Sequence, residues 1–156
     1  MPLNPEDYIF PENYHNDLSD ISNIRCYKDL ENHLGVVNLS KITQKCVLPI
    51  DGIFYGPNSR IFIPLVLNKN GICVHVIFLL DTTSPYTYIS RLTFEALGMT
   101  VTKCTNININ GIITPVYCFP QDINVNILGQ HYLEHAKLNL HINYTERSVK
   151  ISKEKS

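Results

Sequence analysis

The sequence has neither a strong net charge nor a basic cluster. Its 13 Lys and Arg residues and 14 Asp and Glu residues give a formal net charge of -1. No group of Lys or Arg alternates with aromatic residues. Proteins that bind nucleic acids mainly through the phosphates need an excess of positive charge. The sequence therefore predicts no nucleic-acid partner.

The sequence also lacks a long hydrophobic run and a Cys-x-x-Cys motif. Met1–Phe10 has no basic stretch followed by an apolar one, so no signal peptide is expected. The apolar runs are too short to cross a bilayer, so no membrane partner is expected. The cysteines are odd in number and widely scattered: Cys26, Cys46, Cys73, Cys104 and Cys118. This distribution predicts reduced thiols, an intracellular protein of the cytoplasm or nucleus, and no metal or other cofactor.

The first third of the chain has weaker patterns than the rest. Met1–Asn16 is rich in Pro, Asn and acidic residues and is predicted to form an irregular arm. Leu18–Leu34 has apolar residues at helical spacing and ends at Gly35, which predicts a short helix. Val36–Ile50 alternates loosely and predicts a strand, and Asp51–Ser59 predicts a loop because it holds two glycines and a proline.

From Arg60 onward the sequence predicts short strands joined by tight turns. Arg60–Leu67 and Ile72–Leu80 flank an Asn-Gly pair, which is typical of a β-hairpin. Two short helices are predicted over Ser90–Leu97, with Ser90 as the N-cap, and over Gln130–Leu138. The other strand-like segments are Thr87–Ile89, Val101–Ile109, Ile112–Phe119, Val125–Leu128, Leu138–Asn143 and Ser148–Ile151. With 156 residues the chain is predicted to be one mostly β domain that follows an N-terminal extension.

One segment combines a buried strand with a carboxylate. The apolar run Val76–Leu80 leads directly into Asp81, and Thr82, Thr83, Ser84 and Pro85 then end the strand. Asp81 is therefore expected in a loop rich in hydroxyl groups, beside the apolar interior. An Asp at such a position either caps its own turn or serves a catalytic site.

A second segment completes a recognisable pattern. Ile127-Leu128-Gly129 leads into the predicted helix at Gln130, as Asp81-Thr82 follows its own strand. The ordered set of hairpin, Asp-Thr motif, hairpin, Leu-Gly and helix resembles the retroviral-type aspartic proteases, the retropepsins. The resemblance covers about Arg60–Ile151. It implies a closed β-barrel-type fold over residues 60–152, with residues 1–59 as a partly helical or irregular extension.

The resemblance implies a catalytic site shared by two chains. Only one Asp-Thr motif is present, so the Asp81 residues of a homodimer would form the catalytic pair across a two-fold axis. One carboxyl group would act as a base on water while the other protonates the scissile carbonyl. In the family, the Thr corresponding to Thr82 forms a hydrogen bond across this axis. Thr83, Ser84 and Tyr86 are predicted to contact a peptide or protein segment in the groove.

Two departures from the family pattern leave a second function open. The family has Gly where this sequence has Thr83, and a β-branched side chain there would approach the catalytic pair or the substrate. Met99–Ile109 lacks the Gly-rich tip of the hairpin, or flap, that family members fold over the substrate. The alternative is an inactive retropepsin-like module that dimerises or binds a protein segment by strand addition.

A third interpretation involves zinc. His131-Tyr132-Leu133-Glu134-His135 matches the His-x-x-Glu-His pattern of inverzincin metallopeptidases. On a helix, His131 and His135 would share one face, and Glu134 would activate a metal-bound water. The sequence offers no third ligand on a following helix, so exposed polar residues on an amphipathic helix are the favoured interpretation.

Overall fold

Strand β3 (Ile72–Leu80) lies at the centre of the fold, and both of its faces are covered at its C-terminal end. The computed structural model describes residues 18, 20–21, 24–44, 46–120 and 123–154. Within these residues, Phe78 and Leu80 pack in one hydrophobic cluster, and Ile77 and Leu79 pack in a second. Successive side chains of a strand point to opposite faces. The run Val76–Leu80 is apolar without alternation because neither face meets water there.

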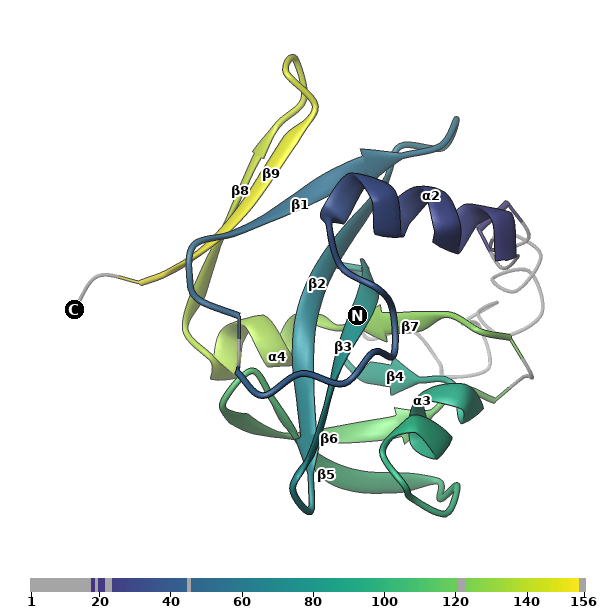
Figure 1. Ribbon diagram of the computed structural model, residues 1–156. Helices are drawn as coiled ribbons and strands as arrows, with labels where there is room; N and C mark the ends of the chain where they lie inside the picture. Colours follow the sequence, from purple (N-terminus) through teal and green to yellow (C-terminus); the bar gives the residue numbers. More distant parts are fainter. Residues whose placement is uncertain (1–17, 19, 22–23, 45, 121–122, 155–156) are drawn as a thin grey trace, which may run out of the picture.

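Six strands close into a barrel. Besides β3, they are β2 (Arg60–Lys69), β4 (Thr87–Ile89), β5 (Cys104–Ile109), β6 (Ile112–Cys118) and β7 (Asn126–Leu128). The hydrogen-bonded order runs β2-β3-β7-β4-β6-β5 and returns to β2 (Figure 1). The β3–β7 and β4–β6 pairs are parallel, and the other pairs are antiparallel. The closed arrangement gives every barrel strand a partner on both sides.

Three further strands extend the sheet outward from β2. They are β1 (Ile50–Tyr55), β9 (Ser148–Lys153) and β8 (Leu138–Asn143), and they follow β2 in that order. The β8–β9 hairpin projects away from the barrel, and β8 forms the free edge of the sheet (Figure 1). The prediction of a mostly β fold built around a closed barrel is confirmed.

Three short helices accompany the sheet in the described part of the chain. They are α2 (Ile24–Leu34), α3 (Arg91–Ala96) and α4 (Gln130–His135). Ser90 is the N-cap of α3, as predicted, and its hydroxyl accepts a hydrogen bond from the backbone N–H of Thr93 at 3.2 Å. Among the residues that the structure describes, no helix has the length and apolar character needed to cross a membrane.

The hairpin of β2 and β3 and the later strands lie where the sequence predicts them, but two earlier segments do not. The prediction of a loop over Asp51–Ser59 is wrong, because β1 occupies most of it. Gly52 is needed there for packing, since a Cβ atom would lie 2.7 Å from the carbonyl oxygen of Phe62. The strand predicted over Val36–Ile50 is reduced to an isolated bridge between Lys41 and Val74, followed by the first residue of β1.

Asn126 connects β7 to helix α3 through a buried side chain. It has no exposed surface, and its Oδ1 atom accepts hydrogen bonds from the Ser90 N–H at 2.9 Å and the Thr93 hydroxyl at 2.7 Å. These donors also belong to the N-cap of α3. Asn126 therefore holds the start of α3 against the strand that precedes Gly129.

We expect Asn126→Ala to lower the free energy of unfolding by about 3 kcal/mol, because it removes the shared acceptor of two buried donors and creates a small cavity. Urea denaturation measures this change. Asn139→Ala, at an exposed position on β8, is the control and should change stability by less than about 0.5 kcal/mol. Equal effects of the two substitutions would contradict the assigned role.

Candidate active site

Asp81 follows the last residue of β3 and begins the loop that leads to β4. Its backbone N–H donates to the carbonyl oxygen of Leu128 at 3.1 Å, so the β3–β7 pairing continues by one residue. The side chain is partly buried. The position is the one that the sequence predicts: a carboxylate where a buried strand ends.

Thr83 orients the Asp81 carboxylate. Both its backbone N–H and its hydroxyl donate to Oδ1 of Asp81, at 3.0 Å and 2.5 Å. Thr82 and Thr83 are exposed to solvent. The Thr83 side chain therefore turns back to the Asp81 carboxylate, and the two donors of Thr83 occupy the two lone pairs of one oxygen.

Ser84 shapes the loop from the inside. It is 3% exposed, its N–H donates to the Asp81 carbonyl at 3.1 Å, and its hydroxyl donates to the Tyr86 carbonyl at 2.9 Å. Its own carbonyl accepts from the N–H of Gln130 at 2.7 Å. The His131 N–H donates to the Pro85 carbonyl at 3.0 Å. The loop thus supplies acceptors for the first N–H groups of α4, which have no partners within the helix.

Gly129 lets the loop and the start of α4 approach each other. Its N–H donates to the buried hydroxyl of Thr87 at 3.0 Å. A Cβ atom at this position would lie 2.1 Å from the carbonyl oxygen of Tyr86, which is far inside van der Waals contact. The second half of the sequence pattern, Leu-Gly before a helix, therefore has a steric reason: only glycine fits against the Asp81 loop.

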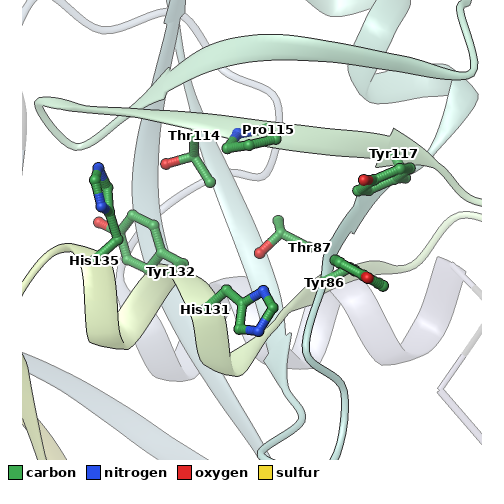
Figure 2. Close-up of a pocket in the computed structure, with 8 residues that line it drawn as sticks. All are labelled: Tyr86, Thr87, Thr114, Pro115, Tyr117, His131, Tyr132 and His135. Carbon is green, nitrogen blue, oxygen red and sulfur yellow. The ribbon is translucent and has the colours of Figure 1, made fainter.

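A pocket of about 310 Å³ opens beside this loop (Figure 2). The Tyr86 ring forms one wall, with its centroid 5.1 Å from that of Tyr117 and 5.5 Å from that of His131. Burial raises the pKa of the Tyr132 hydroxyl, which donates to the carbonyl of Ile109. The lining residues are Tyr86, Thr87, Thr114, Pro115, Tyr117, His131, Tyr132 and His135.

Among the predicted site residues, only Tyr86 lines this pocket. Asp81, Thr82, Thr83 and Ser84 lie outside its lining. His131 and His135 both line it, but their rings lie on opposite sides of Tyr132 and do not converge on one point (Figure 2). No third His, Cys, Asp or Glu joins them within the residues that the structure describes.

Sequence reasoning missed two polar residues that support the site. Thr87 and Asn126 are both buried and hold Gly129 and α3, respectively. Asn126 carried a readable signal, since it is an amide between Val125 and Ile127 in a strand that is otherwise apolar. Thr87 carried none, because a Thr in a short strand is ordinary.

Comparisons with known proteins found a similarity in structure. No family model matches the sequence, and no curated protein matches it. Among solved structures, the chain is similar to a retropepsin-like aspartic protease from Rickettsia conorii. The TM-score is 0.49 and the sequence identity 16%, over 74% of this chain and 98% of that chain. A similarity at this identity assigns no role to individual residues, so their roles must be argued from the geometry of the site.

We expect Gly129→Ala to lower the free energy of unfolding by about 3 kcal/mol, because its methyl group would displace the loop backbone at Tyr86. Gly56→Ala is the control. Gly56 has a φ of +77°, and no neighbouring atom lies within 4 Å of the point that a methyl group would occupy, so backbone strain alone should cost about 1 kcal/mol. Thermal and urea unfolding compare the two, and equal losses would exclude steric interlocking as the reason for Gly129.

Proposed function

We propose that the chain is a retropepsin-like aspartic peptidase domain that acts as a homodimer. Asp81 of each protomer would supply one carboxyl group of the catalytic pair. The observation that carries the proposal is the placement of Asp81, where a strand buried on both faces ends and a loop is locked against Gly129. We further propose residues 60–152 as the peptidase domain and residues 1–59 as its extension.

The chemistry needs two carboxyl groups that share one proton. Like charges in contact cannot both be ionised at little cost, so one group stays protonated. The ionised group takes a proton from water as the water attacks the peptide carbonyl, and the protonated group gives its proton to the carbonyl oxygen. A single Asp81 can supply only half of this pair, so the dimer is part of the mechanism.

The loop residues have distinct roles in this proposal. Thr82 is exposed, as a residue that contacts a second protomer must be in the isolated chain. Thr83 orients the carboxylate, and Ser84 holds the loop from within. Tyr86 is 45% exposed and would offer its ring to a bound peptide.

The alternative is a module that binds a protein segment without cutting it. Between α3 and β7, the described residues form a single hairpin, β5–β6, which turns at Asn110 and Gly111. Both of its strands are part of the barrel wall. A site without a separate hairpin to fold over it excludes water less well, which favours binding over catalysis.

Asp81→Asn tests the peptidase. We expect the wild-type protein to cleave a diverse peptide library between roughly pH 4 and 7, where a shared-proton pair works. Asp81→Asn should lower the rate at least about a hundredfold, because it removes the groups that transfer protons. Mass spectrometry of the products measures both. Asp51→Asn alters a carboxylate whose side chain is 80% exposed and should leave cleavage unchanged.

The same samples test the dimer. Light scattering should give twice the 17.8 kDa of one chain for all three proteins. A monomer would exclude a mechanism with two Asp81 residues. A dimer that cleaves no peptide, either as the wild type or in variants that expose the site, would favour the binding module.

Thr83→Gly tests the departure from the family motif. Removing the hydroxyl frees a lone pair of Asp81 Oδ1 for the attacking water, so we expect kcat/KM to rise about tenfold. Thr83→Ser keeps the hydroxyl and should stay near the wild-type value. A loss of activity in Thr83→Gly would instead show that the Thr83 hydroxyl is needed for catalysis.

A further inference from the structure

The apolar face next to Asp81 consists of side chains on β2, on β3 and on the segment that forms β7. Alternation along β3 puts Ile77, Leu79 and Asp81 on one face, and Leu79 pairs with Ile127 in the parallel register. The Asp81 N–H bond to Leu128 extends this pairing to the carboxylate. We call the following residues the Asp81 face: Phe62, Ile77, Leu79, Val125 and Ile127.

Helix α2 and the residues before it cover this face. Leu18, Ile21, Cys26, Tyr27 and Leu30 belong to the same hydrophobic cluster as the Asp81 face, and none is more than 8% exposed. The residues of the face are at most 4% exposed. Helix α2 contacts β1 and β2 and lies beside them in Figure 1. A peptide that reached Asp81 along this face would meet α2.

Polar contacts fix the edges of this cover. Asp20 accepts from the Arg60 guanidinium at 3.1 Å, in an ion pair in which the Arg60 side chain is 17% exposed and the Asp20 side chain 22%. The Asn58 side chain donates to Asp20 at 3.1 Å. The Tyr55 hydroxyl donates to Asp29, on the exposed side of α2, at 2.9 Å.

We propose that α2, with Leu18, Asp20 and Ile21, is an autoinhibitory cover, and that a peptide with bulky apolar side chains binds the Asp81 face when the cover lifts. That the cover inhibits cleavage rests on the proposed peptidase function. That the cover and a peptide compete for the same face does not.

The barrel is complete without the cover. None of its six strands pairs with α2, and the buried residues of the first hydrophobic cluster all come from Ile50 onward. Helix α2 has 11 residues, and a helix of that length is marginal unless it packs on something. Gly35, with a φ of +72°, follows the helix and ends it. In this proposal the cover detaches while the hydrogen-bonded barrel and its first hydrophobic cluster stay intact.

Tyr27 places a polar group in the contact between α2 and the Asp81 face, as His75 and Asn126 do within the barrel. Its hydroxyl is buried beside the backbone of Asn126, yet it has no hydrogen-bond partner of good geometry among the described residues. Native interiors rarely leave a buried hydroxyl in this state. The Tyr27 hydroxyl would gain water as a partner whenever the cover lifts.

The cover also indicates which side chains the face accepts. Leu18, Ile21, Tyr27 and Leu30 are branched or aromatic, and the face that they contact holds no charged residue. The preferred peptides are therefore those with Leu, Ile or Tyr beside the cleaved bond. A charged side chain on this face would lose its hydration without gaining a partner.

Leu30→Lys in the full chain should open the cover, because it places a charge in the buried cluster. Asn32→Lys puts the same residue at an exposed position of the same helix and is the control. Burial raises the pKa of the Cys26 thiol to about 11, so alkylation at about pH 8 reports opening. Site-resolved mass spectrometry should show faster labelling of Cys26 in Leu30→Lys alone, with Cys73 on β3 unchanged.

A fluorescent peptide with the sequence of residues 18–34, carrying Ser in place of Cys26, then probes the uncovered face. It should bind Leu30→Lys at least about tenfold more tightly than it binds the wild type or Asn32→Lys. The same peptide should inhibit cleavage by Leu30→Lys, which should itself exceed wild-type cleavage. If Cys73 labelling shows that Leu30→Lys unfolds, Asp20→Asn replaces it, since it breaks the ion pair and leaves the apolar residues unchanged.

Equal peptide affinity in the open and closed variants would overturn the proposal, as would wild-type cleavage with Cys26 fully protected. If Leu30→Lys binds the peptide more tightly but no variant cleaves a substrate, the result would support the cover and exclude the peptidase.

Discussion

The burial of β3 on both faces is the constraint on which the rest of the structure depends. One face of the strand packs into the barrel, and Ile77 and Leu79 pack on the other side. Neither face tolerates a charge, so the first carboxylate of this segment stands where the strand ends, at Asp81. The position of the site is therefore set by the interior, and the loop chemistry follows from it.

The loop that begins at Asp81 is fixed by main-chain contacts with a segment distant in sequence, the turn at Gly129 before α4. The Asp81 loop offers carbonyls to α4, and Gly129 admits the loop backbone. Main-chain contacts leave little freedom, because they involve no side-chain rotamers. This rigidity suits the proposed catalytic role, in which the carboxyl group would meet its counterpart in a second protomer at hydrogen-bonding distance.

The later part of the chain was predictable because each element there has a local signal. Asn70-Gly71, Ser90 and Gly98 mark a turn, a cap and a helix end, and the structure has all three. Gly52 misled the prediction, because a glycine needed for close packing in a strand has the same letter as one in a loop. The Asp81 loop was predictable from its sequence neighbours. The packing of α2 was not, since its contacts with strands distant in sequence leave no local pattern.

The pairing of β1 with β9 sets the order in which this sheet can form. Ile50 lies opposite Ile151 in the antiparallel register, and this pairing closes a loop of roughly a hundred residues. The β2–β3 and β5–β6 hairpins need only a few residues to close, so they can form early. During synthesis, β1 must wait for the C-terminal strand to leave the ribosome. Until then its outer edge is open to other strands, and this is the stage at which the nascent chain is most exposed to mispairing.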